Sequence, residues 1–218
     1  MSENPSAKRI APVTPASELF TLASMVLSLP HNLEADAAVV VRGLGLELPL
    51  RCATKELKDL DASYLIVAAA NSTEKTYRHY DKDDLRAPPF NVKPRVAILT
   101  NRHMDHTASQ AAWIAEQIGV TNIKTAVLYA PAYHMVRAYC TVLKGMLKAG
   151  QYIVLLPRPV PMPPWLVVPE NGQDAYEMAH AEAPRILAYQ QKGDVVTLSE
   201  LREYLDWVWK QPPLCNIV

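Results

Sequence analysis

The sequence has few of the features that mark secreted, membrane-spanning or nucleic-acid-binding proteins. Cysteine is scarce: Cys52, Cys140 and Cys215 are far apart and form no CxxC pair. This pattern argues against a disulfide framework and against a zinc knuckle. Lys plus Arg and Asp plus Glu balance at 22 each, so the chain lacks the basic excess typical of nucleic-acid partners. We expect three reduced thiols and no nucleic-acid partner.

Long apolar runs are also missing near the N-terminus. The apolar stretch 19–29 is interrupted by Thr21, Ser24 and Ser28, and it is shorter than the roughly 20 residues that a bilayer span needs. Residues 1–16 are predicted to be a disordered lead. Ser17 is then predicted to cap an amphipathic helix that ends before Pro30. Without a signal sequence or a span, the expected location is the cytoplasm.

The sequence does contain five apolar runs that alternate with helical segments. The runs lie at residues 36–41, 64–68, 95–100, 124–129 and 152–156. Strands that alternate with helices imply βαβ units and a mostly parallel sheet with helices on its faces. We therefore expect an α/β, Rossmann-like domain over residues 17–170, with a C-terminal helical extension over 171–218 packed on the same domain.

Proline shapes the predictions for the C-terminal part of the chain. Six prolines fall between Pro157 and Pro169, which excludes a helix or a central strand and predicts an extended strap over the surface. Pro184 is predicted to begin a new helix after a break at Ala183. A capping box at 197–200 is predicted to begin the last helix.

Candidate ligand-binding residues follow four of the apolar runs. In open parallel sheets, ligands bind beyond the carboxyl ends of the strands, and a parallel sheet would gather these residues at one edge. The candidates are Gly43, Gly45, Asn71, Ser72, Thr107, His134 and Arg137. Thr107 is also predicted to be the N-cap of a helix, with Gln110 as its capping-box partner and Gly119 at the helix end.

The glycine loop after the first run lacks the pattern of a dinucleotide fingerprint. Such a fingerprint needs a third small residue where this chain has Leu48, so a nicotinamide cofactor is not expected. Gly43 and Gly45 either allow a ligand to approach the backbone or form a tight turn.

The segment from Ala130 to Arg137 is the most informative stretch. His134 and Arg137 are three residues apart and share a helix face, in the first turns after a strand, where free amides and the helix dipole favour an anion. Arg137 adds a fork of donors suited to a carboxylate or phosphate. The alternative is structural: an arginine in an ion pair and a histidine that caps a loop.

Other chemical motifs are incomplete. His103 and His106 have the spacing of metal ligands, but no third ligand is assured nearby, so no metal is expected. The loop is predicted either to contribute polar hydrogen bonds or to cap the helix that begins at Thr107. Tyr129, Tyr133 and Tyr139 either stack on a ligand or pack in the usual way, and we favour packing. No Gly-x-Ser-x-Gly elbow, P-loop or Cys–His nucleophile signature is present.

Three segments resemble YdcF-like proteins. Residues 125–138 (TAVLYAPAYHMVRA) resemble that family's strand and histidine–arginine segment, residues 106–111 resemble its helix start, and residues 39–45 with Arg51 resemble its first strand and glycine loop. The resemblance covers about residues 36–157. The chain has Asn101 where the family usually carries an acidic residue. The resemblance implies a Rossmann-like fold and a nucleotide-like ligand, with S-adenosylmethionine as one candidate cofactor.

These observations leave three functions open. The leading prediction is a small-molecule-binding protein with an anionic or nucleotide-like ligand. The alternatives are a hydrolase or transferase that acts on a phosphorylated or envelope-precursor substrate, and an interaction scaffold that uses the proline-rich strap and the helical tail. The sequence leaves the oligomeric state open.

Overall fold

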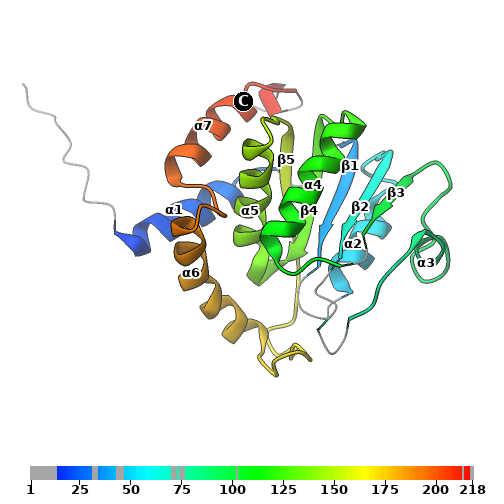
Figure 1. Ribbon diagram of the computed structural model, residues 1–218, viewed down its shortest axis with the longest axis horizontal. Coiled ribbons are helices and arrows are strands. Elements are labelled where there is room, and N and C mark those ends of the chain that lie inside the picture. The colour runs from blue at the N-terminus through cyan, green and yellow to red at the C-terminus, as the bar shows by residue number, and fades with distance from the viewer. Residues whose placement is uncertain are drawn as a thin grey trace, which may run out of the picture.

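The fold is a five-stranded parallel sheet flanked by helices (Figure 1). The computed structural model describes residues 14–30, 34–42, 47–69, 73, 77–101, 103–212 and 214–216. Its strands are β1 (Ala37–Val41), β2 (Tyr64–Ala68), β3 (Ala97–Thr100), β4 (Thr125–Pro131) and β5 (Val154–Val160). Every neighbouring pair is parallel, in the order β3-β2-β1-β4-β5. The predicted Rossmann-like α/β fold is confirmed.

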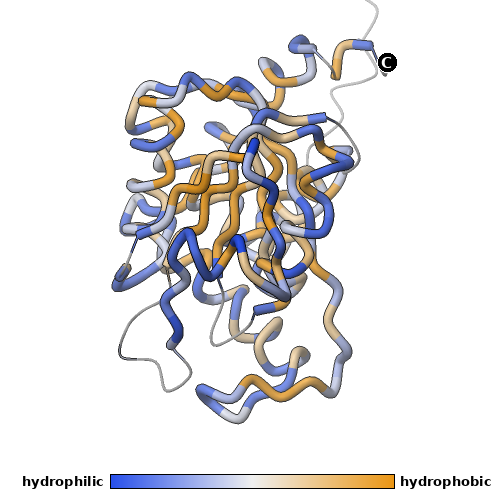
Figure 2. The backbone as a smooth tube through the Cα atoms, turned by 90° about the vertical axis from the view of Figure 1, so that its right-hand side faces the viewer, coloured by the Kyte–Doolittle hydropathy of each residue, from blue (hydrophilic) through white to orange (hydrophobic). Residues whose placement is uncertain are grey.

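Helices cover both faces of the sheet, which explains why the strands are continuous apolar runs rather than alternating ones. All five residues of β1 are buried. On one face, α2 (Leu48–Glu56) packs against β1 and β4. On the other, α4 (Thr107–Thr121) and α5 (Met135–Lys148) lie side by side (Figure 1). In Figure 2 the hydrophobic colour is concentrated in the sheet, which lies between these two layers of helices.

The strand order reverses between β1 and β4. The chain runs outward from β1 through β2 and α3 (Lys82–Arg86) to β3, and then returns through α4 to β4 beside β1. Parallel sheets of this kind bind ligands in the crevice at such a switch point, beyond the carboxyl ends of the two strands. Arg42 follows β1 and His134 follows β4, so both lie at this point.

The fifth strand was predicted to end at residue 156, but residues 157–160 also belong to β5. Proline is tolerated here because β5 is an edge strand with one side unpaired. Leu155 faces that open side: its N–H donates to the Tyr204 hydroxyl at 2.9 Å and its carbonyl accepts from the Tyr139 hydroxyl at 2.9 Å. Successive residues of a strand face opposite sides, so Pro157, two residues after Leu155, faces the same open side. The N–H that proline lacks would therefore not have bonded to β4.

The remaining helices pack outside α5. They are α1 (Pro15–Leu27), α6 (Ala175–Gln191) and α7 (Leu198–Val208), with short 3-10 turns at Ala132–His134 and Leu214–Asn216. The predicted cap of α7 at Thr197 is confirmed, with Glu200 as its partner. Thr14 rather than Ser17 caps α1, and Ser17 is the reciprocal partner in that capping box.

Two predicted helix ends were also wrong. No break occurs at Ala183, because Pro184 lies inside α6. An interior proline removes one hydrogen bond, and the buried side chains of Met178, Glu182 and Ile186 on both sides of it hold α6 together. Helix α4 continues past Gly119 to Thr121. Among the described helices, none is both long enough and apolar enough to cross a membrane.

Candidate functional site

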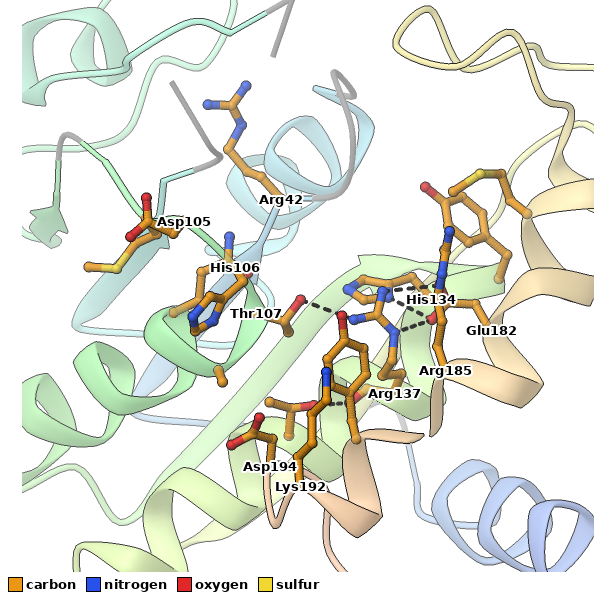
Figure 3. A pocket seen from close by; sticks show the side chains of 17 residues that line it. Arg42, Asp105, His106, Thr107, His134, Arg137, Glu182, Arg185, Lys192 and Asp194 are labelled. Atoms are coloured by element: carbon orange, nitrogen blue, oxygen red, sulfur yellow. Dashed lines mark hydrogen bonds and ion pairs between the residues drawn. The ribbon is translucent and has the colours of Figure 1, made fainter. Parts of the chain in front are cut away.

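A pocket of about 510 Å³ lies at the carboxyl ends of the strands, where the switch point predicts a ligand site (Figure 3). The start of α4, the start of α5 and one face of α6 form its walls. Its lining residues are Arg42, Met104, Asp105, His106, Thr107, Ala108, Gln110, Tyr133, His134, Arg137, Thr141, Met178, Glu182, Arg185, Tyr189, Lys192 and Asp194.

The Glu182 carboxylate is the centre of the polar network in this pocket. One oxygen, Oε2, accepts from Arg137 Nε at 2.5 Å and lies 3.1 Å from His134 Nδ1. The other, Oε1, accepts from Arg137 Nη2 at 3.0 Å and from Arg185 Nη1 at 2.9 Å. Figure 3 shows the three basic side chains converging on this carboxylate. The pair with Arg137 is therefore the bidentate, charge-assisted kind.

Burial and pairing fix the charge states of this network. Burial alone would raise the pKa of Glu182, but the hydrogen bonds from His134 and Arg137 outweigh it and lower that pKa to about 2. Burial, together with the charge of Arg137, lowers the pKa of His134 below its ordinary value of 6.5, although Glu182 opposes this. At pH 7 the carboxylate is ionised and the imidazole is neutral. Because the carboxylate can only accept, the imidazole proton lies on Nδ1.

The first turn of α4 forms the opposite wall. The N-cap is His106, whose Nδ1 accepts from the Ser109 amide at 3.2 Å. The prediction that Thr107 caps this helix was therefore wrong by one residue. Gln110 is not its capping partner, because its side chain is buried and donates to the Ala69 carbonyl at 2.7 Å. The amides of Thr107 and Ala108 have no hydrogen-bond partner among the described residues, as is usual for a first turn.

The structure brings three of the predicted site residues together. Thr107, His134 and Arg137 all line the pocket, and Arg137 Nη1 donates to the Thr107 hydroxyl at 3.2 Å. The fork of Arg137, predicted to hold an anion, holds the Glu182 carboxylate. The other predicted residues, Gly43, Gly45, Asn71 and Ser72, lie outside the described residues.

Sequence reasoning missed the contribution of α6. Glu182 and Arg185 have the i, i+3 spacing that places two side chains on one helix face, but this helix follows no central strand, so the strand-end rule did not include it. Lys192 and Asp194 come from the turn after α6. Arg42 directly follows β1 and was a visible candidate.

Cations outnumber carboxylates in the pocket lining. The cations are Arg42, Arg137, Arg185 and Lys192, and the carboxylates are Asp105, Glu182 and Asp194. Two of the carboxylates also interact with cationic or basic side chains outside the lining: Asp105 lies 2.6 Å from His103, and Asp194 lies 3.7 Å from Lys148. Lys192 is exposed and lies 5.1 Å from the Tyr189 ring centroid, with no carboxylate partner in the part of the chain that the structure describes.

The two histidines that were considered as metal ligands have other roles. His103 forms an exposed pair with Asp105, and His106 caps α4. Within the described ranges, no group of three or more His, Cys, Asp or Glu side chains could hold a metal ion.

The three tyrosines do not share a site. Only Tyr133 lines the pocket, and Tyr139 is a buried residue of α5 whose hydroxyl donates to the Leu155 carbonyl of β5. Tyr129 donates to Glu56 at 2.8 Å, beside an ion pair between Glu56 and Arg158. This cluster lies between α2 and the sheet, and burial with the Glu56 charge raises the pKa of the neighbouring Cys52 to about 11. That thiol is therefore protonated at neutral pH.

Comparison with known families and proteins adds no relative: no family model matches the chain, and no curated protein matches it. The resemblance to YdcF-like proteins stays a prediction.

Proposed function

We propose that this pocket binds a small phosphate-bearing molecule, such as a nucleotide. The observation that carries the proposal is the excess of cations around a concave site at the switch point of a parallel sheet. Glu182 offsets only part of that charge, because two guanidinium groups share its single carboxylate.

Three groups are placed to contact the phosphate. Arg185 is 40% exposed and retains N–H groups beyond its bond to Glu182. Lys192 reaches toward the Thr107 side of the pocket (Figure 3). The free amides in the first turn of α4 add the positive end of a helix dipole. We propose that the phosphate lies between Arg185, Lys192 and the start of α4, beside rather than in place of Glu182.

The surplus of positive charge in the pocket favours a nucleotide over S-adenosylmethionine. The sulfonium and ammonium groups of S-adenosylmethionine would face a pocket that already carries surplus positive charge, whereas phosphates would neutralise it. S-adenosylmethionine is therefore the informative competitor in a binding experiment.

Calorimetric titration with ATP, pyrophosphate and S-adenosylmethionine tests this function. We expect the two phosphate compounds to bind and S-adenosylmethionine to bind at least tenfold more weakly. Arg185→Ala and Lys192→Ala should each weaken phosphate binding roughly tenfold, because a charge-assisted contact contributes about 1.5–3 kcal/mol. Arg95→Ala is the matched control, because Arg95 is exposed before β3 and pairs with Asp61. No binding of either phosphate compound would refute the proposal.

A further inference from the structure

His134 and Glu182 are arranged as a base and the group that orients it. The two side chains are 5% and 6% exposed, and Nδ1 lies 3.1 Å from the carboxylate. The imidazole is neutral, with its proton on Nδ1, so Nε2 carries the lone pair. Among the described residues, no hydrogen bond is made to Nε2. In Figure 3 the ring extends from Glu182 toward the Thr107 side of the pocket.

We propose that His134 is a general base for hydrolysis of a phosphate ester bound in this pocket, and that Glu182 is its positioning residue. This inference rests on the proposed function, because it needs the phosphate to lie in the same cavity. It goes further in assigning a reaction and in giving the two residues separate roles.

The proposed step conserves atoms and charge. A water molecule attacks phosphorus while His134 Nε2 takes one of its protons, so an oxygen–phosphorus bond forms. The bond from phosphorus to the ester oxygen breaks, and its electron pair leaves with that oxygen, which takes a proton from solvent to become an alcohol. The imidazolium then loses its proton to solvent. The products are one alcohol and one inorganic phosphate, with no oxidant or further reactant.

Glu182 serves this step in two ways. It holds His134 in the tautomer whose lone pair is on Nε2, and its charge stabilises the imidazolium as it forms, which is the role of the carboxylate in hydrolytic triads. Arg137 and Arg185 keep Glu182 ionised, since both pair with it. Arg137 also retains N–H groups beyond those hydrogen bonds, and these can contact the phosphoryl oxygens where negative charge develops.

A purely structural role for the pair predicts different behaviour. If His134 only packed in the interior and donated a hydrogen bond to Glu182, its replacement would lower the stability of the fold without changing the rate of hydrolysis. Protonation of His134 would then change no reaction rate. The experiment must therefore measure turnover, binding and folding on the same variants.

Release of p-nitrophenol from p-nitrophenyl phosphate measures turnover. We expect the wild type to hydrolyse this ester and His134→Ala and His134→Gln to lower kcat at least 100-fold, the usual contribution of a general base. Pyrophosphate binding by calorimetry should change less than threefold, and thermal melts should show both variants folded. Added imidazole should restore part of the activity of His134→Ala. Arg95→Ala should retain wild-type turnover.

The pH profile tests the positioning role. The groups that face His134 are Glu182 and Arg185 on α6 and Arg137 on α5, with His106 and Asp105 lining the pocket before α4. Because burial lowers the pKa of His134, wild-type kcat/KM should fall only at a pH below the ordinary histidine value of about 6.5, where the imidazole becomes protonated. In Glu182→Gln this acidic fall in kcat/KM should move to lower pH, because the carboxylate that favours the imidazolium is gone.

The outcomes separate the two proposals. If pyrophosphate binds and no p-nitrophenol is released, or if folded His134 variants release it at the wild-type rate, the catalytic inference is overturned and the binding function stands. If pyrophosphate does not bind either, both proposals fail.

Discussion

Glu182 and Arg137, 45 residues apart, form a bidentate ion pair across the pocket, with N–O distances of 2.5 and 3.0 Å. Arg137 comes from α5 and Glu182 from α6, so the pair joins the Rossmann-like sheet domain to the C-terminal helices. Both side chains are largely buried, and such a pair is costly to break from one side only.

Removing one partner should therefore destabilise the protein strongly. We expect Glu182→Ala to lower the free energy of unfolding by about 3–5 kcal/mol, because Arg137 would be left buried without its counter-ion. Urea denaturation measures this change. Arg185→Ala is the matched control: it touches the same carboxylate but is 40% exposed, so a loss of about 1 kcal/mol or less is expected. Equal losses in the two variants would contradict this account.

Acid should destabilise the protein through the same network. The lowered pKa of Glu182 gives stability that is present above its unfolded value near 4.5 and is lost as the pH falls toward 2. The lowered pKa of His134 acts in the same direction, because the unfolded histidine takes up a proton below about 6.5 while the folded one resists. The free energy of unfolding, measured from pH 7 to pH 3, should fall less steeply in Glu182→Gln than in the wild type. Parallel curves would show that Glu182 is not linked to acid unfolding.

The spacing of His134 and Arg137 was enough to predict that both face one site, since a parallel sheet places the residues after its strands at a common edge. Their main partner could not be predicted in this way. Glu182 reaches them only because α6 folds back over the start of α5, and that packing is a long-range property. Likewise, local rules predicted a break at Pro184, but buried contacts on both sides keep α6 continuous. The fifth strand was predicted to end before Pro157, but it continues to Val160 because an edge strand does not need the missing N–H.

The Tyr204 hydroxyl should stabilise the sheet edge. It accepts from the Leu155 N–H and donates to the Ile153 carbonyl, both at 2.9 Å. In Tyr204→Phe these buried backbone groups lose their partner, so we expect a loss of about 1–3 kcal/mol. Hydrogen exchange at the Leu155 amide should also become faster. Tyr152→Phe on the exposed surface should change neither quantity. An unchanged Leu155 exchange rate in Tyr204→Phe would show that water replaces the hydroxyl without cost.

Two glycines in neighbouring helices should respond in opposite ways to alanine. A Cβ at Gly145 of α5 would lie 2.9 Å from the Ala111 carbonyl oxygen of α4, so Gly145→Ala should force the helices apart and cost about 1–3 kcal/mol. A Cβ at Gly119 meets only the movable side chain of Gln151. Because Gly119 lies within α4, alanine there should stabilise the protein by about 0.5–1 kcal/mol. Thermal or urea unfolding of both variants measures the difference. A stabilising Gly145→Ala would contradict the close approach of α4 and α5.

A crystal structure of the protein grown with pyrophosphate would show directly whether the phosphate binds where we propose. We expect pyrophosphate in the pocket of Figure 3, with its oxygens about 2.7–3.2 Å from the Arg185 guanidinium, the Lys192 ammonium and the first amides of α4. The bidentate pair between Arg137 and Glu182 should remain in place beside it. A pocket that stays empty at a saturating pyrophosphate concentration, or a pyrophosphate bound only at another surface, would contradict the account.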